Sequence, residues 1–540
     1  MRLLLATLSA MLLLVACDSR RAGNDGGATA ANKPVAGGEL VFAFDGAGAS
    51  TFPLDPQRAL FAPHVRIMRS VFDSLVAPLP GNRFGPWLAT EWQATPDGRS
   101  TTFKLRQDVT FHDGTRFDAA AVKANFDRIA DPNNTLPGRQ DLTGFLGATV
   151  VDEFTVRLDF SQPFAPLLSH LAKATFGMIS PTALARYGDQ IPAHPVGTGP
   201  FKVTQIVPGS EVVTERFEAY RWAPEGSSHT GAAWLQRLVF KNVPEEATRA
   251  AVLANGQAQA VDLLPPQNLV QLRGQRDTGV VEAELLNHNY SLHLNITREP
   301  WTDPRVRLAF RQAIDLDAIV KTIYLGTAQR AWAPLSPGVV ASADAALKDR
   351  WKPDRTAAAA ALDAAGWKPG PDGVRQKDGK RLVVQFLDSQ GNREKRLDVI
   401  AMVRRQLREA GFDLRIDSQP GGSMLEKARR GEFDLVGWSQ FASDPDVLRR
   451  IYSAKARTIS GLSQVDDAEL NDWLDAAVQQ TDPAARAALY AKAQERIIDA
   501  TYSIPIYVLT YNVVHSNKVR GITIGTYGFP QFHGAWVAQP

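Results

Sequence analysis

The sequence predicts an α/β protein that is built from more than one packed unit. Its 540 residues exceed what one ordinary hydrophobic core organises, so two or three units are expected. In the second half, an apolar strand at 382–386 precedes a helix at 397–410 with apolar residues at helical spacing, and a strand at 412–416 follows. This strand–helix–strand order predicts a mostly parallel sheet with a right-handed crossover.

The composition describes a folded protein and points to no charged partner. Hydrophobic residues make up 44% of the chain and charged residues 22%, which is typical of a soluble globular protein. The 60 basic and 57 acidic residues give a net charge of +3 and are spread along the chain. Because no run of lysine and arginine forms a nucleic-acid-binding arm, the sequence predicts no nucleic-acid partner.

The first residues form a processing segment. An apolar run at 3–15 is too short to span a bilayer comfortably. Residues 14–17 (LVAC) resemble the bacterial lipobox, and Cys17 is the only cysteine of the chain. We therefore predict a lipoprotein signal peptide at 1–16, lipidation of Cys17, and a glycine-rich flexible tether at 17–38. The alternative is an ordinary secretory signal that happens to contain a cysteine.

The folded chain that follows mixes strands and helices along its length. Val122 and Phe126 are four residues apart, so they are expected to lie on one face of a helix, and Asp118 is predicted to cap the start of that helix. The other expected strands lie at 39–44, 101–105, 109–111, 156–160, 289–295 and 504–511, and the other expected helices at 65–75, 245–255, 467–480 and 483–500. An aromatic segment at 527–536 is expected to pack on the first part of the chain.

One stretch carries a family resemblance. Between Trp92 and Phe126 the order is a tryptophan, Pro96-Asp97-Gly98, an aromatic-x-leucine-arginine strand, Phe111-His112-Asp113-Gly114 and a helix start. This order resembles the extracytoplasmic solute-binding proteins of the peptide/nickel family (family 5), which feed ABC importers. Residues 303–315 resemble a second segment of that family, and matches extend from about Gly38 to the end.

The resemblance implies a two-lobed fold of the periplasmic-binding-protein kind (large type II, cluster C). It places lobe I at 39–287 and 506–540, with an extra subdomain inserted at about 76–190, and lobe II at 288–505. It also implies that the solute lies between the lobes and is enclosed by a hinge motion.

The sequence offers no enzyme motif and no metal cluster. Neither H-E-x-x-H nor G-x-S-x-G is present. His288 and His293 are five apart in a predicted strand, so they are expected to point to opposite faces. Gly197-Thr198-Gly199 lacks the third glycine and the Gly-Lys-Ser/Thr of phosphate loops and is interpreted as a tight turn. His112 is expected to be structural.

The segment 438–446 resembles the family segment that lines the cleft, which makes Trp438, Phe441 and Asp444 candidate contacts. Dipeptide-binding relatives carry an aspartate where this chain has Phe441, and that aspartate pairs with the ammonium group of the peptide. The departure argues against peptides with a free amino terminus, because a buried unpaired ammonium is costly. For Trp438 and Phe441, the alternative is a plain core residue.

Further candidate contacts come from loops that face the cleft in relatives or from strands beside it. They are Phe61, His64, Arg139, Tyr290, Arg330 and Trp332. For Arg139 the alternative is a solvated loop residue. Residues 447–505 contain no histidine, so the direct nickel ligation of some relatives is not expected, whereas a metal carried by a small organic chelator stays open.

The sequence thus predicts a periplasmic, lipid-anchored receptor that captures a small organic solute, peptide-like or a metal chelate. Asp18, after the lipidated cysteine, favours the inner membrane. The expected partners are ABC permease subunits and the membrane, the expected state is a monomer, and no cofactor is expected. A sensing or chaperone-like receptor without an importer, and a hydrolase with an unrecognised site, stay open as alternatives.

Overall fold

The computed structural model describes residues 33–46, 54–59, 62–134, 136–442, 444–458 and 461–538. Met1–Pro34 form a unit separate from Val35–Pro540, and the fold below is that of the second unit. The predicted lipidation site Cys17 and the candidate contact Phe61 lie outside the described residues.

A seven-stranded mixed sheet begins the fold. Its central strand β1 (Glu39–Phe44) was predicted from the sequence and pairs in parallel with its two neighbours. Leu40, Phe42 and Phe44 are fully buried. The sheet order is β12 (Thr278–Glu284), β22 (Thr510–Ser516), β11 (Ala260–Asp262), β1, β10 (Arg237–Asn242), β9 (Glu211–Arg216) and β8 (Phe201–Val207).

The aromatic segment near the C-terminus packs on this sheet, as predicted. The ring of Phe532 lies 5.0 Å from that of Phe42 and 5.6 Å from that of Phe240. The last residues of the chain therefore complete the core that the first strand begins.

A four-stranded antiparallel sheet carries the stretch that bears the family resemblance. Its order is β4 (Ala89–Ala94), β5 (Ser100–Leu105), β7 (Thr155–Phe160) and β6 (Phe145–Asp152). Helix α2 (Ala119–Ala130) starts as predicted, because the Asp118 carboxylate accepts the backbone N–H of Ala121 at 2.8 Å. The strand predicted at 109–111 is wrong: Val109 and Phe111 are buried, but the backbone makes only one isolated bridge there.

A six-stranded sheet forms the second centre of the fold, and the prediction that it is mostly parallel is wrong. Strand β18 pairs in parallel with β19 and β20, as expected of strands joined by α11 (Arg396–Glu409) and α12 (Gly421–Arg429). The other three pairings are antiparallel, because β13 and β21 come from distant parts of the chain. The order is β14 (Gln329–Arg330), β21 (Ser503–Val508), β13 (Asn287–Leu294), β20 (Leu435–Phe441), β18 (Val383–Ser389) and β19 (Asp413–Gln419).

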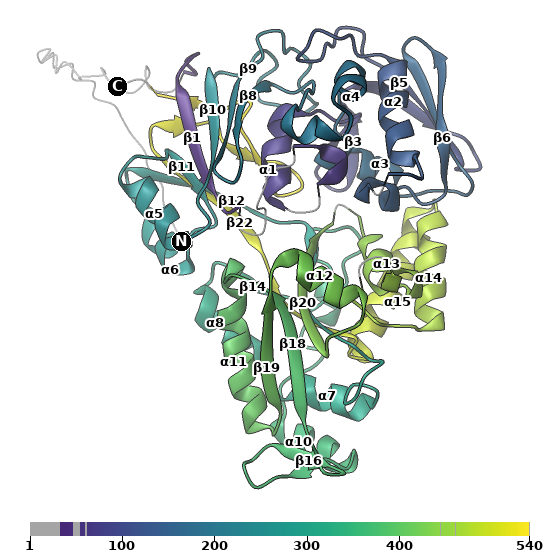
Figure 1. The fold of residues 1–540 in the computed structure, drawn as a ribbon, viewed down its shortest axis with the longest axis vertical. Coiled ribbons are helices and arrows are strands. Elements are labelled where there is room, and N and C mark those ends of the chain that lie inside the picture. The colour runs from purple at the N-terminus through teal and green to yellow at the C-terminus, as the bar shows by residue number, and fades with distance from the viewer. Residues whose placement is uncertain are drawn as a thin grey trace, which may run out of the picture. The chain divides into compact units, whose positions relative to one another are not determined.

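The chain passes between the two large sheets twice. It leaves the seven-stranded sheet between β12 and β13 and returns between β21 and β22, around Leu509. Figure 1 shows β12 and β22 next to each other, above β14 and β20 of the six-stranded sheet. The single strand predicted at 504–511 is therefore two strands, one in each sheet. The elements around the seven- and four-stranded sheets are called lobe I below, and those around the six-stranded sheet lobe II. The lobe boundaries 287/288 and 505/506 stay a prediction.

Helices fill the space around the sheets. Helix α1 (Ala62–Val71) ends earlier than the predicted 65–75. Helices α14 (Ala468–Gln479) and α15 (Pro483–Asp499) agree with the prediction and begin at the caps Asp467 and Asp482. The remaining helices are α3 (Leu167–Leu171), α4 (Pro181–Tyr187), α5 (Glu246–Ala254), α6 (Pro266–Leu272), α7 (Pro304–Gln312), α8 (Leu316–Tyr324), α9 (Asp344–Leu347), α10 (Arg355–Ala364) and α13 (Val447–Tyr452).

Short strands complete the fold. They are β2 (Val76–Leu79), β3 (Arg83–Pro86), β15 (Lys368–Pro369), β16 (Arg375–Lys377), β17 (Lys380–Arg381), β23 (Val519–Arg520), β24 (Thr523–Ile524), β25 (Pro530–Gln531) and β26 (Trp536–Val537). Within the described part of the chain, none of the helices has both the length and the apolar character needed to cross a bilayer.

Candidate functional site

The two lobes meet at an aromatic contact. Phe441, the last residue of β20 in lobe II, lies 5.5 Å from the ring of Tyr527 and 5.1 Å from that of Phe529 in lobe I. These three rings line a small cavity together with Val65, Arg69, Pro78, Ala174, Gly525, Thr526 and Gln531. Its volume of about 30 Å³ is close to the space of one water molecule, so an organic solute fits between the closed lobes only if these ring side chains rotate aside.

Arg69 supplies a fixed positive charge at this cavity. Arg69 lies in the last turn of α1, and its guanidinium donates to Ser74 Oγ at 3.1 Å and to the Ala172 carbonyl at 2.8 Å. It also lies 4.8 Å over the Trp87 ring. Burial lowers the pKa of Arg69 to about 10, and nearby Asp73 limits that fall, so the side chain stays charged at neutral pH. A solute carboxylate could bind here.

A second cation lies where strand β18 leads into α11. Arg396, the first residue of α11, donates to Glu394 Oε2 at 2.7 Å and to Ser439 Oγ at 2.6 Å. Its guanidinium lies 4.4 Å over the ring of Tyr290. Tyr507 donates its hydroxyl to Glu394 Oε2 at 2.8 Å. The cluster thus joins β13, β20, β21 and the start of α11 at the carboxyl end of a parallel strand, where open α/β sheets bind ligands.

The backbone at this cluster is strained. Glu394 and Lys395 are consecutive residues in the left-handed region, with φ of 54° and 61°. Each such residue costs about 1 kcal/mol or more without a compensating contact. Burial alone would raise the pKa of Glu394, but Arg396 and Arg393 outweigh it and bring the pKa to about 2. Lys395 also forms an ion pair with Glu246 of α5 in lobe I, so this segment connects the lobes.

Of the candidate contacts, Phe441 lies at the cavity and Tyr290 in the Arg396 cluster. Tyr290 is fully buried, and its hydroxyl has no hydrogen-bond partner among the described residues. Trp438 is half-buried and packs against the core around Leu387 and Met424. His64 is buried on α1. The binding roles of these residues stay predictions.

The remaining candidates lie neither at the cavity nor in the Arg396 cluster; they are Arg139, Arg330, Trp332 and Asp444. Arg330 lies 4.7 Å over Trp332 and donates to the Pro505 carbonyl at 2.7 Å, which ties β14 to β21. Arg139 is exposed, and its guanidinium donates to the Asp131 carbonyl at 3.4 Å. Asp444 is buried, and both its oxygens accept from Arg486, at 3.0 and 2.6 Å. The structure thus gives each of these side chains a structural partner.

Sequence reasoning did not select Arg69, Arg396, Glu394 or Tyr507. For Arg396 a signal was available, because it lies in the connection that follows a predicted parallel strand. No signal in the sequence pointed to Arg69 or Tyr507, because only the tertiary fold brings α1 and β21 near the lobe interface.

The expectation that His288 and His293 point to opposite faces is wrong. Their rings are stacked with centroids 5.3 Å apart, and both are fully buried. The cause is an irregularity of register between His288 and Ser291 in the pairing of β13 with β20, which breaks the alternation of sides. Among the residues that the structure describes, no three histidine, cysteine, aspartate or glutamate side chains come together as a possible metal site.

The glycine turn and His112 have a structural role, in agreement with the prediction. His112 Nε2 donates to the Gly199 carbonyl at 2.9 Å, and Nδ1 accepts the Gly197 N–H at 3.3 Å. A Cβ atom on Gly197 would come within 2.1 Å of the Val71 carbonyl oxygen. The glycines therefore serve a close backbone approach at the end of α1.

Comparison with known proteins adds the family. Residues 83–460 match the model of the bacterial extracellular solute-binding proteins, family 5. The chain belongs to this family. Members of the family serve ABC importers and work outside the cytoplasm, and their fold has two lobes. This confirms the fold class and the solute-binding function predicted from the sequence.

Relatives of this solute-binding protein bind chemically different solutes. The glutathione-binding protein GsiB of Escherichia coli (strain K12) is 28% identical over 487 residues, 88% of this chain and 91% of the relative. The structure of NikA from Brucella suis with Fe(III)-EDTA has a TM-score of 0.79 at 28% identity and covers 93% of this chain and 100% of that one. DppA from Helicobacter pylori with the peptide STSA matches at 0.79 and 25%, over 94% and 99%.

Proposed function

We propose that this protein captures a small organic solute that carries carboxylates, either a peptide-like compound or a metal chelate, between its lobes and delivers it to an ABC permease. The observation that carries the proposal is the cavity where Phe441, Tyr527 and Phe529 from the two lobes meet beside the half-buried cation Arg69. Aromatic rings can cover a flat or apolar part of a solute, and the guanidinium can pair with a carboxylate.

Unmodified dipeptides fit this site poorly. Phe441 stands where dipeptide-binding relatives carry an aspartate, and Asp444 nearby in the sequence is already bound by Arg486. An ammonium group beside the ring would therefore lose its water without gaining a carboxylate. Glutathione and Fe(III)-EDTA, the ligands named for two relatives, each present more carboxylates than a dipeptide and are better probes, and Fe(III)-EDTA also lacks the ammonium group that glutathione carries.

The test is titration calorimetry with glutathione, Fe(III)-EDTA and Met-Leu, after native mass spectrometry of the purified protein for a retained solute. We expect at least one of the two carboxylate-rich probes to bind and Met-Leu to bind weakly. Loss of stacking in Phe441→Ala should weaken that binding about 3- to 10-fold, since one aromatic pair contributes roughly 0.5–1.5 kcal/mol. Arg69→Gln should weaken it at least as much.

Phe154→Ala is the matched control, because this ring lies between β6 and β7, against Arg116, and lines no part of the cavity. It should leave the affinity unchanged. Tight binding of Met-Leu that Phe441→Ala does not diminish would overturn the proposal.

We also propose that a lipid on Cys17 anchors the protein to the membrane, and that the lobes divide at 287/288 and 505/506. Lipidation at Cys17 would hold the receptor at the membrane, through the tether at 17–38, as a monomer. Replacing Cys17 with serine should move the protein from the membrane fraction to the soluble fraction. A serine variant that still sediments with membranes and keeps the mass of the lipid would show that the anchor lies elsewhere.

A further inference from the structure

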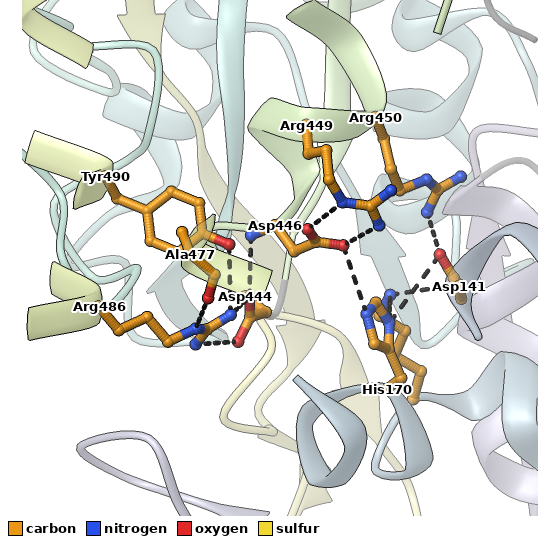
Figure 2. A network of polar contacts seen from close by, with 10 residues as sticks. Asp141, His170, Asp444, Asp446, Arg449, Arg450, Ala477, Arg486 and Tyr490 are labelled. Carbon is orange, nitrogen blue, oxygen red and sulfur yellow. Dashed lines mark hydrogen bonds and ion pairs between the residues drawn. The ribbon is translucent and has the colours of Figure 1, made fainter. Parts of the chain in front are cut away.

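Besides the aromatic contact and the Lys395–Glu246 ion pair, the lobes meet at a network of charged side chains (Figure 2). On lobe I it contains Asp141, at the end of a 3₁₀ turn (Pro137–Asp141), His170 of α3, and Lys173. On lobe II it contains Asp446, just before α13, and Arg450 within α13. None of these five side chains lines the cavity beside Phe441.

The lobe II half of the network is ordered by contacts within its own lobe. Arg449 donates to both oxygens of Asp446, at 2.7 Å each. Arg486 holds Asp444 in the same bidentate way, and Asp444 Oδ1 accepts the backbone N–H of Asp446 at 2.8 Å. Because paired guanidinium–carboxylate bonds fix geometry, Asp446 faces lobe I in a defined position (Figure 2).

The lobe I half is ordered in the same way. Lys173 Nζ donates to His170 Nδ1 at 2.7 Å and to Asp141 Oδ2 at 3.3 Å. Since an ammonium group only donates, His170 Nδ1 must accept, and the ring proton lies on Nε2. That nitrogen lies 4.0 Å from Asp446 Oδ2 of lobe II. The rings of Phe164 and Phe176 cover the imidazole at 5.7 and 6.5 Å.

Two contacts join the halves of the network: Arg450 forms an ion pair with Asp141, and His170 approaches Asp446. A backbone hydrogen bond also crosses between the lobes, from the Ala165 N–H to the Val478 carbonyl at 2.9 Å. The side chains of Asp141, His170 and Asp446 are each no more than 9% exposed, so these charges are strongly shielded from water. The two cations Arg450 and Lys173, with His170, overcome the effect of burial and hold the pKa of Asp141 far below its usual range.

We propose that Asp141, His170 and Arg450, positioned by Lys173 and Asp446, form a latch that holds the lobes together and raises solute affinity without touching the solute. Any solute enclosed between the lobes binds to the closed form, so its apparent affinity scales with the population of that form. The latch stabilises the closed form through charges that separate and become hydrated when the lobes part. The effect on affinity rests on the proposed function, whereas the effect on lobe separation does not.

The test measures lobe separation without any solute. In a Cys17→Ser background, spin labels at Val151→Cys of β6 and Glu469→Cys of α14, both exposed positions, report the distance between lobes by pulsed electron resonance. We expect Arg450→Gln to shift the distance distribution toward longer values. Arg450→Lys, which keeps the charge, should restore most of the original distribution.

Arg430→Gln is the matched control, because Arg430 pairs with Glu432 inside lobe II. It should change neither distances nor affinity. Asp141→Asn breaks the same crossing contact from the other lobe and replaces Arg450→Gln if that variant does not fold. The thermal midpoint of Arg450→Gln should stay near that of the unaltered protein, since each lobe keeps its own core, whereas Asp141→Asn also leaves the buried Lys173 without its carboxylate and should lower the midpoint.

The outcomes separate the two proposals. A distribution that is the same in Arg450→Gln, Asp141→Asn and the unaltered protein would overturn the latch. If neither glutathione nor Fe(III)-EDTA shifts the distances of the unaltered protein, the proposed function loses support while the latch can still stand. When a probe binds, the latch predicts that Arg450→Gln weakens it about tenfold, which is less than the effect of losing a fully buried pair, because Arg450 is 20% exposed and Asp141 keeps Lys173.

Discussion

Loss of the buried carboxylate of Asp262 should destabilise lobe I by several kcal/mol. Asp262 Oδ2 lies 2.8 Å from Arg66 Nη1 and accepts the Tyr511 hydroxyl at 2.8 Å, and Oδ1 accepts the Asp45 N–H at 3.0 Å. It therefore ties β11 to the helix α1 and to the strands β1 and β22. Asp262→Asn removes the charge and keeps the size.

The expected cost follows from burial. The side chains of Arg66 and Asp262 are 2% and 0% exposed, so the substitution leaves a guanidinium without its counter-ion in the interior. Removing one partner of a buried ion pair typically costs about 3–5 kcal/mol. For a lobe of this size, that corresponds to a fall of roughly 5–10 °C in the thermal midpoint.

Scanning calorimetry of the solute-free protein measures the effect, with Glu282→Gln as the control. Glu282 pairs with Arg273 in the same lobe, but the two side chains are 26% and 39% exposed, so its loss should cost under about 1 kcal/mol. If Asp262→Asn lowered the midpoint no more than Glu282→Gln, the buried Arg66–Asp262 ion pair would stabilise lobe I no more than an exposed pair does, and the reasoning would be refuted.

Two further predictions concern the end of helix α1. Burial raises the pKa of the Asp73 carboxyl to about 7, well above its usual range. Because the folded-state pKa is the higher one, its contribution to stability is fully present below about pH 4 and is lost as the pH rises toward 7. Asp73→Asn cannot ionise, so its thermal midpoint relative to the unaltered protein should rise between pH 4 and 8, and a constant difference would contradict this. Gly197→Ala places a Cβ atom 2.1 Å from the Val71 carbonyl oxygen and should lower the midpoint by several degrees, whereas Gly373→Ala, with nothing within 4 Å, tests the cost of its positive φ alone.

Local signals in the sequence were sufficient to locate helices. Asp118, Asp354, Asp467 and Asp482 each precede a helix and accept a backbone N–H of its first turn. Such caps depend on residues within one turn of each other, so the sequence alone reveals them. The parallel pairing of β18 with β19 was likewise predicted, because one helix joins the two strands.

Long-range pairing was not predictable in the same way. The stacking of His288 on His293 depends on an irregular register with β20, a strand about 145 residues away in the chain. The apolar run predicted as one strand at 504–511 is divided at Leu509, because its first part pairs within the six-stranded sheet and its last part within the seven-stranded sheet. For the candidate site, resemblance placed Phe441, and the position of Arg396 after a predicted parallel strand was a usable signal, whereas Arg69 is brought to the cavity only by the tertiary fold.

The place of β22 bears on the order in which the protein can fold. This strand lies between β11 and β12 and pairs with both, although it comes some 250 residues after β11 along the chain. Until Thr510–Ser516 has been synthesised, β12 has no partner within the seven-stranded sheet and Asp262 lacks the hydroxyl of Tyr511. The strands of lobe II are made earlier, between Asn287 and Val508. A chain emerging from the ribosome can therefore complete its second lobe first, and the lobe that begins the sequence is the last to close.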